Sequence, residues 1–303
     1  MTRIVCIGGA VLDRAYRLDA PARAGTSNPA RASLAFGGVA RNVAESLARM
    51  GDGVALVSLV GEDESGAALL AHARAVGIDV SAVARVQDAR TAEYVCVLEP
   101  DGGLAMGLAA MELFARLDRA FVEGHAALVE SAGLVFGECN LAADAVAALI
   151  AHARVGGVPL ALDAVSVAKS ARLPRDLSGT SVLFCARDEA EAIVGAAREP
   201  EALAGALVER GAAAAVVTLG ADGLVLAERD APHRRLPAPA ADVVDVTGAG
   251  DALIAGTLHR LAAGAPLADA LRTGQRLARL AIARPGAVRA DLTPALVEEI
   301  DHA

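Results

Sequence analysis

Aromatic residues are scarce in this sequence: they make up 2% of its 303 residues, and tryptophan is absent. Few side chains are therefore available for the stacking surfaces that single-stranded nucleic acids require. The formal net charge of −9 at pH 7 also opposes binding to a phosphate backbone. We therefore expect no nucleic-acid partner, and the composition favours a small-molecule ligand.

Long apolar runs are also missing, although hydrophobic residues make up 54% of the chain. Alanine supplies much of that fraction, and no stretch reaches the roughly 18 purely apolar residues of a membrane span. The N-terminus leads directly into an expected strand and shows no signal peptide. We expect a soluble, cytoplasmic enzyme with no membrane partner.

The four cysteines show no CxxC spacing and stand in separate apolar, strand-like runs: Cys6, Cys96, Cys139 and Cys185. This pattern favours reduced core residues over a disulfide set or a metal site. The histidines also lack the spacing of a metal site, so the sequence offers no cluster of soft metal ligands.

Apolar strand-like runs alternate with helical patterns along the chain. Strands are expected at 3–7, 54–60, 134–136, 159–162, 182–185 and 215–219, and helices at 39–50, 65–76, 142–154, 188–194, 200–210, 267–283 and from 294 onward. This alternation predicts an α/β fold with a mainly parallel sheet and helices on both faces.

Two segments interrupt this alternation: residues 14–36 are polar and contain Pro, Gly and Ser, and residues 91–111 form a hairpin pattern around a turn at 100–103. We expect one domain over 1–303, with both segments forming a small β lid at the ligand-binding edge. A purely decorative surface hairpin is the alternative. Exposed hairpin edges would favour a homodimer that pairs through the lid.

The run Asp245-Val246-Thr247-Gly248-Ala249-Gly250-Asp251 precedes a long Ala/Leu-rich helical pattern. The glycines allow backbone N–H groups to converge on an anion at the helix N-terminus, where the helix dipole is positive. Asp251 would lie on the first helical turn, where it could accept a proton from an attacking hydroxyl. The pattern predicts phosphoryl transfer to an alcohol, and an ordinary glycine-containing helix cap is the alternative.

A second motif, Gly37-Gly38-Val39-Ala40-Arg41-Asn42, opens a helix near the N-terminus. Paired glycines let the backbone approach a ligand, and Asn42 offers both a donor and an acceptor. Asp13 follows the first strand, where a carboxylate could accept hydrogen bonds from sugar hydroxyls. A capping or packing role for the glycines and an ordinary turn aspartate are equally open.

Lysine and asparagine are almost absent: Lys169 is the only lysine, and the asparagines are Asn28, Asn42 and Asn140. All four occur in expected loops or helix starts, and Asn140 closely follows Glu138 at the end of a strand. Where a residue type is otherwise avoided, the remaining examples mark side chains that are hard to replace. Lys169 is a compact charge that arginine does not mimic beside a hydroxyl or phosphate.

Together these motifs resemble the two signatures of the ribokinase-like (PfkB) carbohydrate kinases, and the resemblance covers essentially the whole chain. Within that family, segments 27–30, 37–45, 91–102, 138–141 and 163–169 are most similar to the pseudouridine kinases. The resemblance implies transfer of the γ-phosphoryl group of ATP to the ribose 5′-hydroxyl of pseudouridine, with Mg²⁺ as the cofactor.

The resemblance also implies roles for individual residues. Asp251 corresponds to the general base, and the amides of Gly248, Ala249 and Gly250 to the anion hole. The expected acceptor-binding residues are Asp13, Asn28, Gly37, Gly38, Asn42, Glu138, Asn140 and Lys169. Thr218, Gly220 and Gly223 correspond to the nucleotide segment, Glu189 to an acid that acts on Mg²⁺ through water, and Asp245 and Thr247 to an optional K⁺ site.

The sequence departs from the family pattern at three places. Cys185-Ala186 stands where the family usually has Pro-Asn, Ala164 replaces a proline, and Ala110 replaces an acid of the lid hairpin. Other acceptors (ribose, adenosine or a ketose) and a catalytically silent binding protein therefore stay open. A Rossmann dehydrogenase is disfavoured because no GxGxxG opens a βαβ unit.

Overall fold

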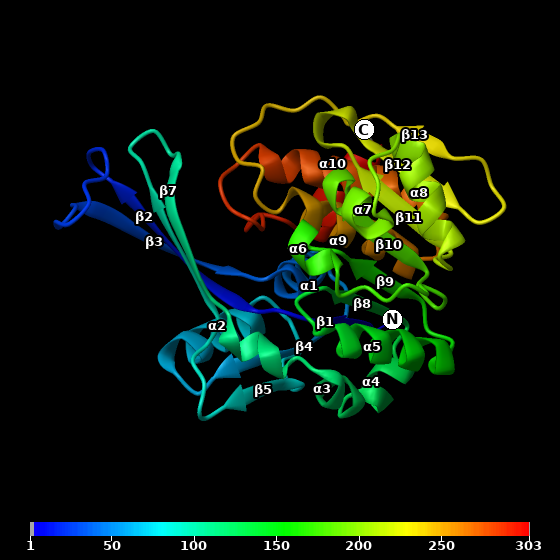
Figure 1. Cartoon of the computed structure of the whole chain (residues 1–303), viewed down its shortest axis with the longest axis horizontal. Helices are drawn as coiled ribbons and strands as arrows, with labels where there is room; N and C mark the ends of the chain where they lie inside the picture. The colour runs from blue at the N-terminus through cyan, green and yellow to red at the C-terminus, as the bar shows by residue number, and fades with distance from the viewer. Residues whose placement is uncertain (1–2, 303) are drawn as a thin grey trace.

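The computed structural model describes residues 3–302, and within that range the strands form two sheets. The large sheet has nine strands in the order β13-β12-β11-β10-β9-β8-β1-β4-β5 (Figure 1). Its strands are β1 (Ile4–Ile7), β4 (Val54–Gly61), β5 (Val83–Val86), β8 (Leu134–Glu138), β9 (Leu160–Asp163), β10 (Val182–Ala186), β11 (Ala214–Thr218), β12 (Leu224–Glu228) and β13 (Arg234–Leu236).

Neighbouring strands run parallel from β5 to β11, and in this sheet only β12 runs in the opposite direction, antiparallel to both β11 and β13. Strand β1 sends alternate side chains to opposite faces, as the period of two requires. Ile4 and Cys6 join one buried core, and Val5 and Ile7 join the other. The predicted mainly parallel α/β sheet is thus confirmed.

Helices cover both faces of this sheet. The core containing Ile4 is completed by α1 (Val39–Arg49), α2 (Glu64–Ala75), α9 (Ala249–Ala262), α10 (Leu267–Ile282) and α11 (Pro294–His302). The opposite core is completed by η1 (Glu112–Arg116), α3 (Arg119–Glu123), α4 (Ala126–Glu130), α5 (Ala143–Gly156), α7 (Arg187–Val194) and α8 (Pro200–Glu209). Two short elements, α6 (Val167–Ser170) and η2 (Gly220–Asp222), lie at strand ends.

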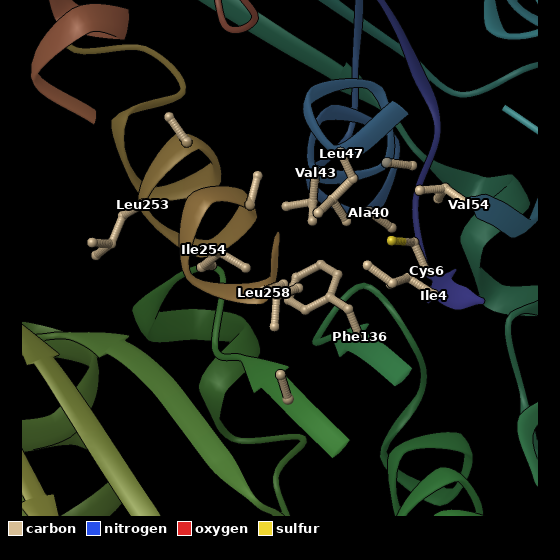
Figure 2. Close-up of a cluster of buried hydrophobic side chains, with 14 of the residues drawn as sticks. Ile4, Cys6, Ala40, Val43, Leu47, Val54, Phe136, Leu253, Ile254 and Leu258 are labelled. Carbon is tan, nitrogen blue, oxygen red and sulfur yellow. The ribbon is translucent and has the colours of Figure 1, made fainter. Parts of the chain in front are cut away.

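Helices α1 and α9 come from opposite ends of the chain and pack side by side over the sheet (Figure 2). Val43 and Leu47 of α1 and Ile254 of α9 are wholly or almost wholly buried in the same core. Phe136 of β8 fills the floor beneath them. This packing brings the first turns of both helices to one edge of the sheet.

The lid is a four-stranded sheet in the order β3-β2-β6-β7, with β2 (Val11–Leu18), β3 (Ala30–Gly37), β6 (Glu93–Leu98) and β7 (Leu104–Ala110). It projects from the body as a separate arm (Figure 1). The expected hairpin is present as β6 and β7, with a register shift beside Val97. The first lid segment begins earlier than predicted, and its two strands pair with each other while β2 runs parallel to β6.

Several elements differ from the sequence-based expectation. Asp13 lies within strand β2 and not in a turn, and Gly37 ends strand β3 where a loop was expected. Strands β5, β12 and β13 were not predicted. Strands β5 and β13 are short and carry arginines in place of an apolar run. Cys96 is a half-buried lid residue, which corrects its assignment to the core.

Within residues 3–302, no helix combines the length and the apolar character that crossing a membrane requires.

The α9–α10 contact depends on a glycine, which gives a test of how the fold holds the site. A Cβ at Gly274 would overlap the Leu253 carbonyl and the Thr257 hydroxyl of α9. We expect Gly274→Ala to reduce the free energy of unfolding by about 1–3 kcal/mol, because overpacking forces the helices apart. Urea denaturation measures this change.

Gly205→Ala in α8 is the matched control, because the added methyl group meets only the ring of His233, which is exposed. This variant should keep or raise stability through the better helix propensity of alanine. Equal stability of both variants would show that the α9–α10 spacing is not limited by Gly274.

Candidate active site

The site lies where the parallel strands of the large sheet end. Glu138 ends β8 and is paired in register with Asp163, which ends β9. Thr218 ends β11, and Gly8 and Gly9 follow β1. The carboxyl ends of parallel strands lie at one edge of a sheet, and this is the edge at which open α/β sheets usually bind ligands.

Asp251 lies at this edge, on the first turn of α9. Its Oδ2 accepts a hydrogen bond of 2.7 Å from Nδ2 of Asn42 in α1. The pKa of Asp251 is raised to about 6, mainly by burial. The hydrogen bond from Asn42 and the nearby Arg41 oppose this rise, and Glu138 adds to it. A carboxyl group with this pKa is ionised at neutral pH and can accept a proton from an alcohol.

The helix start beside Asp251 is open to an anion. Gly248 is the N-cap of α9 and has φ of 77°, and a Cβ there would overlap the Ala287 carbonyl. A Cβ at Gly250 would meet no atom within 4 Å, so the space in front of this residue is free. The first amides of α9 have no acceptors within the helix, and that of Ala249 donates a 3.2 Å hydrogen bond to the Val246 carbonyl of the preceding loop. A phosphoryl group could therefore bind them with the help of the helix dipole.

Two cavities meet at Gly250. The smaller, of about 170 Å³, is lined by Asp163, Glu189, Thr218 and Asp251 among others. The larger, of about 450 Å³, is lined by Thr218, Gly220 and Gly223 together with apolar side chains of α9 and α10. Because Thr218, Gly250 and Leu253 line both cavities, the predicted nucleotide segment lies next to the predicted catalytic residues.

The predicted sugar-binding residues Asp13, Gly37 and Gly38 also meet. A Cβ at Gly37 would overlap the Asp13 carboxylate, and one at Gly38, whose φ is 95°, would overlap the Gly9 carbonyl. Burial raises the pKa of Asp13 to about 6, and Arg41 lowers it. Position 38 therefore requires glycine, and a side chain at position 37 would displace the Asp13 carboxylate.

Glu138, Asn140 and Lys169 form a further group at the ends of β8 and β9. Glu138 is fully buried and accepts hydrogen bonds of 2.5 Å each from the amides of Gly9 and Asn140. Burial raises its pKa, while these hydrogen bonds and Lys169 lower it. Burial also lowers the pKa of Lys169, and Glu138 opposes that change. The expected acceptor side therefore contains a mutually stabilised acid and lysine.

Asn28 does not join this group, because it lies in the turn between β2 and β3. Its Oδ1 accepts from the Arg23 amide, and its Nδ2 donates to the carbonyls of Arg23 and Thr26. These three hydrogen bonds hold the turn of the lid and account for an asparagine at this position. A role in binding the acceptor stays a prediction.

Asp245 and Thr247 lie on the loop before α9. The Asp245 carboxylate accepts hydrogen bonds from the amides of Thr247 and Gly286. Burial raises the pKa of Asp245, but these hydrogen bonds outweigh it and the pKa is lowered overall. The carboxylate thus ties two loops together beside the anion site, and its role toward K⁺ stays a prediction.

Glu189 is buried, whereas the sequence alone gave it the appearance of a solvated helix acid. Its Oε2 accepts a 2.8 Å hydrogen bond from the Ala186 amide, which closes the start of α7. Burial raises its pKa, and this hydrogen bond lowers it. Because Ala186 offers no polar side chain, the side-chain oxygens that line the smaller cavity come from Glu189, Asp163, Thr218 and Asp251.

Glu189 and Asp163 could hold Mg²⁺ only together with water molecules and substrate phosphates. Within residues 3–302, no group of three or more His, Cys, Asp or Glu side chains is arranged to hold a metal ion. Mg²⁺ usually keeps several waters and binds one or two carboxylates together with substrate phosphates. Glu189 and Asp163, which line the smaller cavity beside the helix start, match that donor set.

Three buried or bridging groups at the site were not predicted: Arg41, Asp163 and Arg172. Asp163 ends a parallel strand like Glu138, and that position was the available signal. Arg172 Nη1 donates to the carbonyls of Cys139 and Asn140, which fixes the loop after β8. For Arg41, the i, i+4 spacing to Glu45 indicated an ion pair but not its place beside the site.

The free space at Gly250 gives a test of the anion site. Gly250→Ala should keep the free energy of unfolding, because the methyl group meets no protein atom. It should reduce turnover at least about tenfold by displacing a bound phosphoryl group, since small misplacements of reactants are costly. Thermal unfolding and ADP release measure the two effects.

Gly248→Ala is the contrasting variant, because its left-handed backbone and the overlap with Ala287 should reduce stability as well. Wild-type turnover in a folded Gly250→Ala protein would remove the α9 N-terminus from the reaction.

Residues 1–294 match the model of the pfkB family of carbohydrate kinases. The chain is 28% identical over 283 residues to the pseudouridine kinase of Escherichia coli (strain K12), covering 92% of this chain and 90% of that enzyme. The guanosine-inosine kinase of Exiguobacterium acetylicum is 26% identical over 288 residues, covering 93% and 95%.

Solved structures show the same relationship. A carbohydrate kinase from Agrobacterium tumefaciens matches with a TM-score of 0.89 and 30% identity, over 100% of this chain and 97% of that one. Arabidopsis thaliana ribokinase, solved with ribose and ATP, matches with a TM-score of 0.86 and 22% identity, over 99% and 98%. The last likeness shows the ribokinase-like fold. With nearly its whole length matched by one family model, the chain belongs to the pfkB family of carbohydrate kinases.

Proposed function

We propose that this kinase transfers the γ-phosphoryl group of ATP to the ribose 5′-hydroxyl of pseudouridine. Membership of the pfkB family supports the ATP-dependent phosphotransferase activity. The similarity to pseudouridine kinase and the motifs at 27–30, 91–102 and 138–141 support the acceptor. The observation that carries the proposal is the hydrogen-bonded pair Asn42–Asp251 beside the open start of α9.

In the proposed reaction, the Asp251 carboxylate takes the proton of the acceptor hydroxyl. The hydroxyl oxygen then forms a bond to the γ-phosphorus as the bond to the β-phosphate oxygen breaks, and ADP leaves. The amides at the start of α9 stabilise the charge on the transferred group. The Gly250 amide belongs to this group, and the Ala249 amide joins it by exchanging its 3.2 Å hydrogen bond to the Val246 carbonyl for one to the phosphoryl group. Asp13, Gly38 and Asn42 hold the sugar, so positioning supplies much of the rate enhancement.

Bound Mg²⁺ would neutralise charge on the β- and γ-phosphates. Glu189 and Asp163 are the residues proposed to hold it through water. Thr218, Gly220 and Gly223 line the larger cavity, which is proposed to receive ATP. Closing the lid over the acceptor would exclude water and suppress hydrolysis of ATP.

A different nucleoside is the second candidate for the acceptor. The chain is nearly as similar to a guanosine-inosine kinase as to a pseudouridine kinase. The lid hairpin has Ala110 where the pseudouridine kinases resembled by this sequence carry an acid. If that acid reads the base, a purine nucleoside would be the better acceptor here.

The acceptor test is ADP release with Mg²⁺–ATP and pseudouridine, uridine, inosine, guanosine, adenosine, ribose or fructose. We expect the highest kcat/KM for pseudouridine. In Asp251→Asn, turnover should fall by several orders of magnitude while ATP binding is kept, because the lost interaction acts in the transition state.

Preference for another acceptor would keep the kinase and discard pseudouridine as the substrate. Wild-type turnover in Asp251→Asn would remove this carboxylate from the role of general base. Binding of a nucleoside without turnover on any acceptor would instead support a catalytically silent protein.

We also propose that two copies pair through the lid. Exposed apolar side chains lie along β7 and its neighbours, with Leu104, Met106 and Leu108 each more than half exposed. Strand β7 is also an edge with unpaired backbone groups. Such a surface on a projecting arm is the expected footprint of a second copy.

Met106→Glu combined with Leu108→Glu should convert a dimer to a monomer, because like charges would meet across the two-fold interface. Multi-angle light scattering measures the molar mass. Val155→Glu on α5 is the control, since Val155 is equally apolar and 76% exposed but lies away from the lid. A monomeric wild-type protein, or a dimer unaffected by the lid changes, would contradict pairing through the lid.

A further inference from the structure

Helix α1 carries a buried cluster of charged side chains next to the site. Arg41 is 2% exposed, and its Nη2 lies 2.6 Å from Oε2 of Glu45. Arg49 binds the other oxygen of Glu45 at 2.7 Å. Burying an ion pair costs much of what its attraction gains, so this pair is weak evidence for a role in stability. Its position beside Asn42 points to another role.

Arg41 makes a second contact that leads to the proposed general base. Its Nη2 donates a 3.0 Å hydrogen bond to Oδ1 of Asn42, and Nδ2 of Asn42 donates a 2.7 Å hydrogen bond to Asp251. A guanidinium group carries only donors, so the Asn42 atom that faces it must be the oxygen. The amide nitrogen is then turned toward Asp251. The contact with Arg41 thus fixes which way the Asn42 amide points.

The charges around Asp251 make this orientation matter. Carboxyl groups surround it from several elements: Asp13 on β2, Glu138 on β8, Asp163 on β9 and Glu189 on α7. Lys169 offsets Glu138, and Arg41 is the cation that acts on both Asp13 and Asp251. Burying Arg41 is also unfavourable for folding, because its Nε has no hydrogen-bond partner among residues 3–302.

We propose that Arg41 is a positioning residue: it orients the Asn42 amide, and through it keeps the Asp251 carboxylate ionised and directed at the acceptor hydroxyl. This inference rests on the proposed function of Asp251. It adds a requirement for a residue that touches neither ATP nor the transferred group.

The direct test follows the ionisation of Asp251 without any acceptor. In protein labelled with ¹³C at the aspartate carboxyl groups, a pH titration by NMR gives the midpoint of each group, and Asp251→Asn assigns the Asp251 signal. The wild-type pKa of Asp251 should lie at about 6. In Arg41→Met the midpoint should rise by roughly one pH unit, because a nearby cation and an oriented donor are lost.

Arg49→Met is the matched control. Arg49 binds the same Glu45 and lies on the same helix, but it makes no hydrogen bond to Asn42. Its loss should leave the Asp251 midpoint where it is in the wild-type protein. If Arg41→Met does not fold, Arg41→Gln replaces it, since glutamine keeps an amide donor without the charge and should also raise the midpoint.

The kinetic test uses the sign of the same shift. A general base works only when deprotonated, so a higher pKa moves the acidic limb of the kcat/KM profile to higher pH. Relative to wild type, Arg41→Met should lose more activity at pH 6.5 than at pH 9. Arg41→Lys should recover part of the loss at low pH because it keeps the charge. A role that is only structural would lower activity equally at all pH values.

An unchanged Asp251 midpoint in Arg41→Met, or an equal shift in Arg49→Met, would overturn the inference. A raised Asp251 midpoint in Arg41→Met, together with a wild-type protein that phosphorylates no acceptor, would support the contact chain and refute the proposed function. Turnover with an unmoved midpoint would do the reverse.

Discussion

The hydrogen bond between Asn42 and Asp251 is the contact on which the candidate site depends. It joins residues that are 209 positions apart in the chain, at the first turns of α1 and α9. Both helices reach this position because their apolar faces pack over the same strands (Figure 2). The glycine at the start of each helix lets its backbone approach a neighbouring loop, Gly38 against Gly9 and Gly248 against Ala287. The site is therefore a product of core packing.

The second constraint is electrostatic. The ends of neighbouring parallel strands bring Glu138 and Asp163 to the same edge as Asp251, and burial raises the pKa of all three. Such a concentration of acids suits a site that receives a cation and gives up a proton. Burying several carboxyl groups together is unfavourable unless hydrogen-bond donors point at them. The backbone amides at Glu138, the Asn42 amide and the Arg41 guanidinium supply those donors.

The arrangement also suggests how one edge can serve two ligands. The larger cavity is walled by the end of β11 and by α9 and α10, whereas Asp13, one of the residues predicted to bind the sugar, belongs to strand β2 of the lid. Gly250 stands between them and lines both cavities. A phosphoryl group at the start of α9 would thus be within reach of a nucleotide on one side and an alcohol on the other.

Much of this could be predicted from local sequence patterns. The parallel sheet follows from apolar runs separated by helical periods, and DVTGAGD predicts an anion site with an acid beside it. Contacts between distant segments could not be predicted in this way. The sequence alone gave Glu189 the appearance of a solvated helix acid, yet tertiary packing buries it against Ala186. Arg41 resembles any arginine of an i, i+4 pair until α9 is placed beside it.

Asn28 illustrates the opposite difficulty. A rare residue in a loop indicates that the side chain is needed, but not for what. In the structure its amide holds the turn of the lid through three hydrogen bonds. Rarity therefore identifies residues under constraint, and only geometry separates those that support a loop from those that face a ligand.

The most direct test of the account is a crystal structure with Mg²⁺, ADP, tetrafluoroaluminate and pseudouridine. Tetrafluoroaluminate imitates the phosphoryl group in transit, so its position identifies the reacting centre. The account predicts that it binds the amides at the start of α9, with the Asp251 carboxylate within hydrogen-bonding distance of the ribose 5′-hydroxyl. Its binding away from α9, or a different acid beside the acceptor hydroxyl, would contradict the account.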